Sequence, residues 1–205
     1  MDTPADDDTV GDVAFALEGT SLPRDHAVPL AQALCARLAW LAALPAAGIH
    51  PVKVVPGHGA WGLLSQRARL LLRLPLARLP ALAALSGCSL DVGGCALRLG
   101  APRPRELLAH STLYAPFVAA EDADEALFMQ AVAREMQAMQ IGGHSVCGRR
   151  QRIGAPGPAI TGFSLMLHGL APADSLRLQR SGLGPHRLFG CGIFVPHRSA
   201  AAVGA

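Results

Sequence analysis

The chain has 205 residues, of which 51% are hydrophobic, 16% charged and 4% aromatic, and its formal net charge is +3. This length suits one large domain or two small ones, and the apolar half of the composition excludes a disordered polymer. Of the 18 basic residues, 17 are arginine, a ratio that is typical of a GC-rich genome. The chain's cations are therefore almost all guanidinium groups, which suit phosphate binding.

Charge is unevenly distributed along the chain. Residues 1–25 carry a balance of −6, residues 26–125 carry +3, and residues 126–205 carry +6. An acidic N-terminus argues against a signal or transit peptide, and arginine and proline interrupt every apolar stretch before the roughly 20 residues that a membrane span needs. Five scattered cysteines without a CxxC pair indicate reduced thiols and no metal site. We therefore expect a cytoplasmic protein with no membrane association, no metal and no cofactor.

Hydrophobic periodicity in the first half predicts the order β-α-β-β-α-β. In chain order the expected elements are an acidic tail (1–12), a strand (13–17), a helix capped by Asp25 (25–41), a loop (48–59), two paired strands (61–64 and 67–74), a short helix (75–85) and a hairpin about Gly93–Gly94 (90–92 and 95–99). The period-two rule places Arg67, Arg69 and Arg73 on one face of their strand. A linker is expected over residues 99–111.

The second half repeats this order. In chain order its expected elements are a strand (112–119), a helix opened by Asp124 (124–140), two strands (145–153 and 160–167), a short helix from Pro172 and a final strand (192–196). Leu127, Ala131 and Met139 are candidates for the buried face of the long helix. The pattern predicts an α+β protein of two tandem ferredoxin-like (RRM-like) domains, over residues 13–103 and 104–199, with a short tail over 200–205.

A glycine-rich segment separates the last short helix from the last strand. Gly182, Gly184, Gly190 and Gly192 stand in a G-x-G-x₅-G-x-G frame, with His186 and Arg187 at its centre. Because glycine permits positive φ and a close approach of backbone N–H groups, such a loop can bind an anion or can simply make a tight turn. It is not a dinucleotide fingerprint, since that motif follows a strand and opens a helix.

Several stretches of the sequence resemble the RAMP superfamily of CRISPR-associated proteins, above all its RNA-processing endoribonucleases of the myxobacterial type I subgroup. The clearest are GFSLMLHGLAPADSLRLQRSGLG (162–184) and HRLFGCGIFVPHRS (186–199). Looser similarities are LPRDHAVPLAQAL (22–34), GIHP (48–51), RARLLLRLP (67–75), LDVGGCALRLGAPR (90–103) and STLYAPFV (111–118). The resemblance covers about residues 12–199 and carries a glycine-rich loop before the last strand, which is the signature of the superfamily.

The resemblance implies a metal-independent nuclease that cuts precursor CRISPR RNA within each repeat. In that family a 2′-hydroxyl attacks the adjacent phosphate, which leaves a 2′,3′-cyclic phosphate and a 5′-hydroxyl end. The reaction needs a base for the 2′-hydroxyl, an acid for the leaving oxygen and a cation for the charged phosphorane. Family members also commonly hold the repeat hairpin and join other subunits of a type I CRISPR effector complex.

The resemblance places the catalytic histidine in the first domain, at or after its first helix. His50, in the loop after that helix, and His26, at its start, both match, and they could share the role. Histidine suits proton transfer near neutral pH. Lys53 could neutralise the phosphorane. The alternative interpretations are a capped helix residue for His26, a loop histidine beside proline for His50 and a solvated lysine for Lys53.

Two groups of arginines are candidates for binding RNA. Arg149, Arg150 and Arg152 lie on one strand of the second domain, and Arg67, Arg69 and Arg73 form the first-domain group. A strand that carries arginines is often no more than a solvated face, but the +6 balance of the C-terminal part favours phosphate contact. His186, Arg187 and the four loop glycines complete the expected RNA-binding set.

Three other functions fit parts of the sequence. A RAMP-type subunit could bind guide RNA without cutting it and would need no histidine at position 26 or 50. An RRM-like module for cellular RNA would stack bases on aromatic side chains of its central strands, but the nine aromatic residues form no such cluster. A purely structural or interaction protein would bind partners with an affinity that ignores salt.

Overall fold

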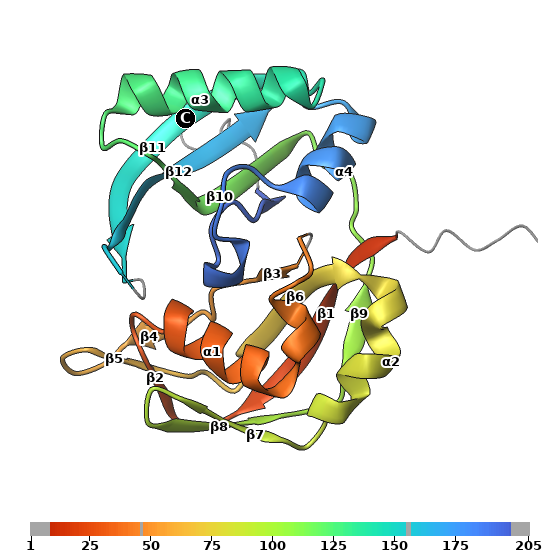
Figure 1. The fold of residues 1–205 in the computed structure, drawn as a ribbon, viewed down its shortest axis with the longest axis vertical. Coiled ribbons are helices and arrows are strands. Elements are labelled where there is room, and N and C mark those ends of the chain that lie inside the picture. The colour runs from red at the N-terminus through yellow and green to blue at the C-terminus, as the bar shows by residue number, and fades with distance from the viewer. Residues whose placement is uncertain (1–8, 46, 155–156, 198–205) are drawn as a thin grey trace, which may run out of the picture. The chain divides into compact units, whose positions relative to one another are not determined.

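The computed structural model describes residues 9–45, 47–154 and 157–197, and the chain divides into two compact units, Met1–Glu106 and Leu107–Ala205. Both units combine sheets with helices, so the expected mixed α+β class is confirmed (Figure 1). The boundary follows Glu106, whereas the sequence places it after residue 103. No helix among the described residues is long and apolar enough to cross a membrane.

The first unit is built on a sheet with the strand order β3-β6-β1-β8-β7, to which β9 adds by pairing with β1. A second sheet has the order β2-β5-β4. The strands are β1 (Val10–Glu18), β2 (Ser21–Pro23), β3 (Gly48–Ile49), β4 (Val55–Pro56), β5 (Trp61–Leu63), β6 (Arg69–Pro75), β7 (Ser89–Val92), β8 (Cys95–Leu99) and β9 (Arg103–Arg105). The helices are α1 (Ala27–Arg37), η1 (Ala39–Leu41), η2 (Leu76–Arg78), α2 (Leu79–Leu82) and η3 (Ala83–Leu85).

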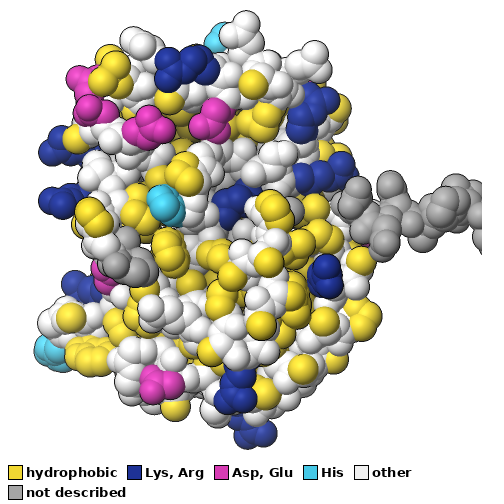
Figure 2. Space-filling view, in the orientation of Figure 1, with side chains coloured by type: hydrophobic (Ala, Val, Ile, Leu, Met, Phe, Trp, Pro, Cys, Tyr) yellow, Lys and Arg dark blue, Asp and Glu magenta, His cyan; other side chains and the backbone are white. Residues whose placement is uncertain are grey.

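Alternation along β1 and β6 gives this sheet one apolar face. Val13, Phe15 and Leu17 of β1 are buried, and so are three leucines of β6, at positions 70, 72 and 74. Helix α1 adds buried leucines at positions 30 and 34. Because side chains alternate along a strand, Asp12, Ala14 and Ala16 project from the opposite face. In Figure 2 the visible surface over α1 and α2 is largely apolar, with few charged groups.

Three predictions for the first unit are wrong at the level of strand pairing. Strand β1 begins at Val10, so Asp12 belongs to the sheet and not to an acidic tail. Strands β5 and β6 do not pair with each other, because β5 pairs with β2 and β4 whereas β6 pairs with β1 and β3. The expected linker contains β9. The segment 48–59 is mostly loop, as predicted, and includes only the short strands β3 and β4.

The start of α1 also differs from the prediction. The helix begins after His26, which stands at the N-cap without a side-chain capping bond, so Asp25 does not cap it. The hairpin about Gly93–Gly94 is confirmed. Both glycines have positive φ, and the Asp91 Oδ1 atom accepts a hydrogen bond from the Gly94 N–H. Positive φ at two successive turn residues is the conformation that favours glycine there.

The second unit contains one sheet with the order β11-β12-β10-β13. Its elements are β10 (Thr112–Ala119), α3 (Glu125–Ala138), β11 (His144–Ile153), β12 (Ile160–His168), α4 (Pro172–Ser181), η4 (Arg187–Phe189) and β13 (Val195–Pro196). The N-cap of α3 is Asp124, as predicted, and its side chain accepts a hydrogen bond from the Leu127 N–H. Strand β11 lies at one edge of the sheet.

The prediction for the buried face of α3 is wrong for Leu127, whereas Ala131 is half-buried and Met139 is half-buried against the core. Leu127 is 50% exposed, whereas Phe128, Val132 and Met136 are buried. The Phe128 ring stacks on Phe163 of β12, with the ring centroids 4.8 Å apart. This aromatic pair fixes the rotation of the helix on the sheet, because both rings belong to the core.

Candidate active site

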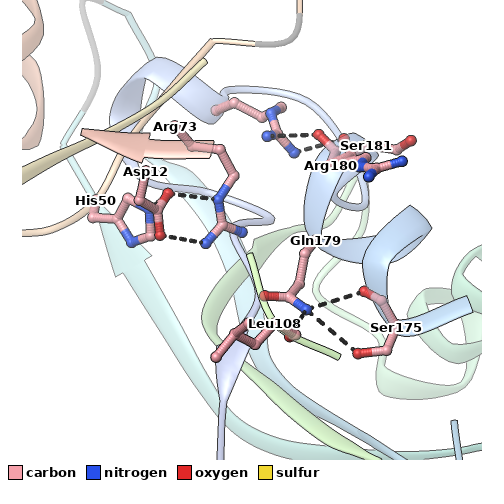
Figure 3. A network of polar contacts seen from close by, with 9 residues as sticks. Asp12, His50, Arg73, Leu108, Ser175, Gln179, Arg180 and Ser181 are labelled. Carbon is pink, nitrogen blue, oxygen red and sulfur yellow. Dashed lines mark hydrogen bonds and ion pairs between the residues drawn. The ribbon is translucent and has the colours of Figure 1, made fainter. Parts of the chain in front are cut away.

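A buried ion pair joins the two central strands of the first unit. Asp12 of β1 lies directly opposite Arg73 of β6. The Arg73 Nε atom donates to Asp12 Oδ1 at 2.8 Å, and Arg73 Nη2 donates to Oδ2 at 2.9 Å (Figure 3). Arg73 is only 1% exposed. A two-pronged bond of this kind fixes the plane of the carboxylate and compensates much of the cost of burying a guanidinium.

His50 completes this cluster from the edge of the same sheet. It follows β3, and its backbone N–H donates to the Leu71 carbonyl of β6 at 3.0 Å. Its ring Nε2 lies 3.1 Å from Asp12 Oδ1, so this oxygen is shared by the imidazole and the guanidinium (Figure 3). His50 is 6% exposed. The strand pairing therefore places the imidazole on a fixed anionic partner.

The ionisation of Asp12 determines which histidine nitrogen carries the proton. Burial raises the pKa of Asp12. Hydrogen bonds from His50 and Arg73, together with their positive charges, lower it by more than burial raises it, so the pKa lies well below its usual range. An ionised carboxylate can only accept hydrogen bonds, so Nε2 of His50 must be the donor. In the neutral ring, Nδ1 is then the basic nitrogen, and Asp12 would stabilise the imidazolium once Nδ1 takes a proton.

His26 has a different environment, although it is also 6% exposed. Its Nδ1 lies 2.9 Å from the Pro23 carbonyl, and its Nε2 accepts a hydrogen bond from the Val52 N–H at 3.1 Å. These partners assign the proton to Nδ1. Both ring nitrogens are therefore used inside the first unit, and the ring attaches the start of α1 to the loop that follows His50. This geometry favours a positioning role for His26, and its catalytic role stays a prediction.

Lys53 lies on that same loop and is exposed. Within the described residues, the structure records no hydrogen bond or ion pair for its ammonium group. This loop therefore carries three groups: His50, the Val52 N–H that donates to His26, and the exposed ammonium of Lys53, three residues beyond His50. This order along the chain is compatible with the expected role of Lys53.

The N–H groups of the loop glycines are bonded within the second unit. The N–H groups of Gly182, Gly190 and Gly192 donate to backbone carbonyls, and the Gly184 N–H donates to Glu135 Oε2 at 2.9 Å. All four glycines have positive φ, and an added Cβ at Gly182 or Gly192 would collide with the facing strand of the loop. In this conformation, the glycines serve close packing of the loop. Their N–H groups are not directed to an external anion.

Arg187 also has a structural position. It is 8% exposed, and its guanidinium donates to the Ser181 carbonyl at 2.6 Å and to the Arg180 carbonyl at 3.2 Å. These carbonyls belong to the last turn of α4, where helix groups lack intrahelical partners and a cation is favoured. His186, which precedes it, is exposed and has a φ of 68°. Of the two central loop residues, His186 is the one accessible to a ligand.

The arginines of the second unit lie on its edge strand, β11. Arg149, Arg150 and Arg152 are all exposed. A register shift between Cys147 and Arg150 marks a bulge, and the Arg149 N–H donates to Ser164 Oγ at 2.9 Å. The bulge re-aims the strand, so that Arg150 and Arg152 share one face and Arg149 occupies the other. The edge therefore offers guanidinium groups on both of its faces.

The character of the surface beside α3 is the opposite. Figure 2 shows acidic side chains gathered along this helix. Glu121, Asp122 and Glu135 line a hollow there of about 490 Å³. Carboxylates disfavour phosphate, so RNA contact is expected at the edge of the sheet and not at α3.

The first-domain arginines separate into two kinds. Arg67 lies in the turn before β6 and Arg69 at the start of that strand, and both side chains are exposed. Arg73 is instead buried in its ion pair with Asp12. Asp12 is a site residue that sequence reasoning missed, and Arg73, expected among the RNA-binding arginines, is instead buried against it. A fully buried arginine in the leucine-rich strand RLLLRLP requires a carboxylate partner, and this requirement was the available signal.

Comparisons with known proteins point to one family. The family model described as Cas6 Crispr matches residues 12–199. A CRISPR-associated endonuclease Cas6 from Myxococcus xanthus (strain DK1622) is 34% identical over 193 residues, which cover 94% of this chain and 84% of that protein. The fold and sequence thus define a CRISPR-associated protein. More particularly, the chain belongs to the Cas6 family.

Solved structures show the same fold at low sequence identity. A CRISPR-associated protein Cas6 has a TM-score of 0.68 at 12% identity, over 92% of this chain and 100% of that one. A Cas6-related protein from Pyrococcus furiosus has a TM-score of 0.59 at 9% identity, over 91% and 98%. Thermus thermophilus Cse3 bound to an RNA representing a pre-cleavage complex has a TM-score of 0.52 at 14% identity, over 91% and 98%.

Proposed function

We propose that this chain is an endoribonuclease that cuts precursor CRISPR RNA within its repeats to give guide RNAs. Membership of the Cas6 family supports this, and the Myxococcus relative is named as an endonuclease. The observation that carries the proposal is the cluster of His50, Asp12 and Arg73, which presents an imidazole on a fixed carboxylate. We also propose that the two units are the tandem ferredoxin-like domains, on the basis of the sheet orders β3-β6-β1-β8 and β11-β12-β10-β13.

The proposed reaction is metal-independent transesterification. The 2′-hydroxyl loses its proton and its oxygen bonds to the adjacent phosphorus, while the bond from phosphorus to the 5′-oxygen breaks. The products are a 2′,3′-cyclic phosphate and a 5′-hydroxyl that has gained a proton. His50 takes the acid/base role through Nδ1, because Asp12 holds Nε2 protonated. Lys53 is the candidate cation for the phosphorane.

Binding of the repeat is assigned to exposed basic groups. Arg149, Arg150 and Arg152 of β11 would contact phosphates in the second unit, together with His186 of the glycine-rich loop. Arg67 and Arg69 would contribute in the first unit. Guanidinium groups bind phosphate in a forked geometry, and an edge strand with arginines on both faces can follow a backbone. Other subunits of a type I effector complex are possible further partners of the bound product.

The test is incubation of the protein with end-labelled repeat RNA in the presence of EDTA. Cleavage with a cyclic phosphate detected by mass spectrometry is the expected result. A 2′-deoxy nucleotide at the cleavage site should abolish cutting, and so should His50→Ala, while Lys53→Ala should slow it. The matched control is His58→Ala, which changes an exposed histidine of the same unit.

The same experiment distinguishes a second candidate function from the nuclease. A RAMP-type subunit that binds guide RNA without cutting it would share the fold and the arginine edge. Tight binding of intact repeat RNA by the wild-type protein, with no product in EDTA or in added Mg²⁺, would favour this function and overturn the nuclease assignment. A nuclease that needs Mg²⁺ would overturn only the metal-independent step.

A further inference from the structure

A basic hollow lies on the face of the first unit's sheet that carries Asp12 and Arg73. It has a volume of about 400 Å³. Its small lining residues are Ala14, Ala16, Gly100 and Ala101, and its long ones are Arg69, Arg103 and Arg105. Arg103 and Arg105 come from β9, the strand that sequence analysis took for a linker. Neither arginine belongs to the RNA-binding groups expected from the sequence.

Strand register explains why the hollow exists. On β1, Ala14 pairs with Arg103 of β9, and Ala16 pairs with Arg69 of β6. Directly paired residues of antiparallel strands project to the same face. The central strand therefore supplies methyl groups as a floor, while the strands on either side supply long side chains as walls. A leucine in place of Ala16 would fill the space that these methyl groups leave open.

The charge of the hollow is uncompensated. Three guanidinium groups line it, and no carboxylate does. Among the described residues, the structure records no hydrogen bond or ion pair for the side chains of Arg103 and Arg105, which are both exposed. Arg69 donates through one nitrogen to the Ala68 carbonyl at 2.7 Å. Asp12 lies directly opposite Arg105 on β9, but both of its carboxylate oxygens already accept hydrogen bonds from Arg73, and His50 bonds one of them. Like charges around one concavity favour an anionic ligand.

We propose that this hollow binds a phosphodiester group of the RNA whose neighbouring phosphate is cut at His50; the inference rests on the function proposed above. Along β1, a rise of about 3.3 Å per residue puts Ala14 about 7 Å and Ala16 about 13 Å from Asp12. His50 is bonded to Asp12, so the hollow lies near the candidate catalytic histidine. A phosphate bound in the hollow therefore belongs to a nucleotide close to the cleavage site on the same RNA strand. The arginines of β9 supply forked donors, and the alanine floor admits the phosphate to the sheet.

The experiment measures the affinity of repeat RNA that carries a 2′-deoxy nucleotide at the cleavage site, so that binding is separated from cutting. In Arg103→Ala/Arg105→Ala the Kd should rise about tenfold or more near 0.15 M salt. The slope of log K against log salt should become shallower by about 1.4, because each phosphate contact to single-stranded RNA contributes roughly 0.7. The control is Arg37→Ala/Arg78→Ala, which removes the same charge outside the hollow and should leave the slope almost unchanged.

A second variant tests shape without changing charge. Ala16→Leu fills the floor of the hollow. Because position 16 is exposed, the variant should fold normally, and it should bind RNA more weakly than the wild type. Unchanged Kd and slope in both pocket variants would overturn the proposal. So would stabilisation by inorganic phosphate that the double variant loses while its RNA affinity stays intact, because that result identifies a site for the free ion.

Failure of this inference is distinguishable from failure of the proposed function. His50→Ala should abolish cleavage of normal repeat RNA while its Kd for the deoxy-substituted RNA stays close to that of the wild type. If the wild-type protein cuts no RNA, the proposed function fails, but the affinity comparison still tests the hollow. If cleavage depends on His50 and the pocket variants bind normally, only the phosphate site is wrong.

Discussion

Arg73 donates hydrogen bonds to both carboxylate oxygens of Asp12, its direct partner on the neighbouring strand, and His50 bonds one of the same oxygens. The register of β1 and β6 therefore fixes the imidazole before any substrate binds. In the proposed reaction Asp12 acts through His50, so it is a positioning residue. Its pairing with Arg73 also makes it part of the core, which links the proposed chemistry to the stability of the first unit.

Substitution of Asp12 by Asn should slow single-turnover cleavage about tenfold or more. The amide can no longer stabilise an imidazolium, and it can present an NH₂ group to His50 in place of an acceptor. The midpoint of the pH–rate profile should also move, which a merely structural loss would not cause. Asp12→Glu should recover part of the rate. Asp91→Asn is the control, because Asp91 caps the exposed hairpin turn; an unchanged rate and profile in Asp12→Asn would contradict the positioning role.

Acid should destabilise the wild-type protein through Asp12. Its pKa is lowered in the folded state, whereas the unfolded value is about 3.9. Its contribution to the free energy of unfolding is therefore complete above the unfolded pKa and is lost as the pH falls towards the folded pKa. Urea denaturation between about pH 6 and pH 3 should show a steeper loss of stability in the wild type than in Asp12→Asn. Parallel curves for the two proteins would refute this.

Breaking the pair also has a direct cost. Asp12→Ala should lower the free energy of unfolding by about 3–5 kcal/mol near neutral pH, because it leaves the Arg73 guanidinium buried without its carboxylate. The double change Asp12→Leu/Arg73→Met should recover much of this loss, since it removes both charges and keeps apolar volume. A double variant as unstable as Asp12→Ala would show that the packing of the pair, and not its charge, dominates.

The sequence predicts features that depend on neighbouring residues and misses those that depend on distant ones. Asp124 caps α3 and two glycines turn the hairpin, because both motifs are complete within a few residues. The sequence predicts a linker where β9 lies, since Pro102 and Pro104 flank Arg103 and the pairing partner, β1, lies about 90 residues earlier. The same limit applies to the histidines. His26 and His50 are equal candidates in sequence, and only the long-range contacts to Val52 and Asp12 distinguish them.

His26 should affect cleavage through the loop that it holds. His26→Ala leaves the buried Val52 N–H without its acceptor, which costs about 1–3 kcal/mol of stability and loosens the segment after His50. We expect a lower rate with an unchanged pH–rate midpoint. His26→Gln, whose side chain can still accept the Val52 bond, should recover activity although it cannot transfer protons. If His26→Gln were as inactive as His50→Ala at an intact melting temperature, His26 would be a proton-transfer residue.

Arg187 should contribute to stability and not to RNA affinity. Arg187→Ala removes the donors to the carbonyls of Arg180 and Ser181 and should cost about 1–3 kcal/mol, because these groups lie in a partly buried turn. Thermal denaturation should show the loss, while the Kd for repeat RNA, measured at a temperature where the variant is folded, should stay close to the wild-type value. A large rise in Kd without a change in melting temperature would return Arg187 to the RNA-binding set.

The arginines of β11 should behave in the opposite way. All three are exposed on an edge strand, so Arg149→Ala/Arg150→Ala/Arg152→Ala should change the melting temperature little. If each guanidinium contacts one phosphate, the slope of log K against log salt should become shallower by roughly 0.7–0.9 per contact, the range between single-stranded and duplex nucleic acid. This variant would then lose RNA affinity and keep its stability, whereas Arg187→Ala would lose stability and keep its RNA affinity. A triple variant that keeps the wild-type Kd and salt slope would move the RNA away from this edge.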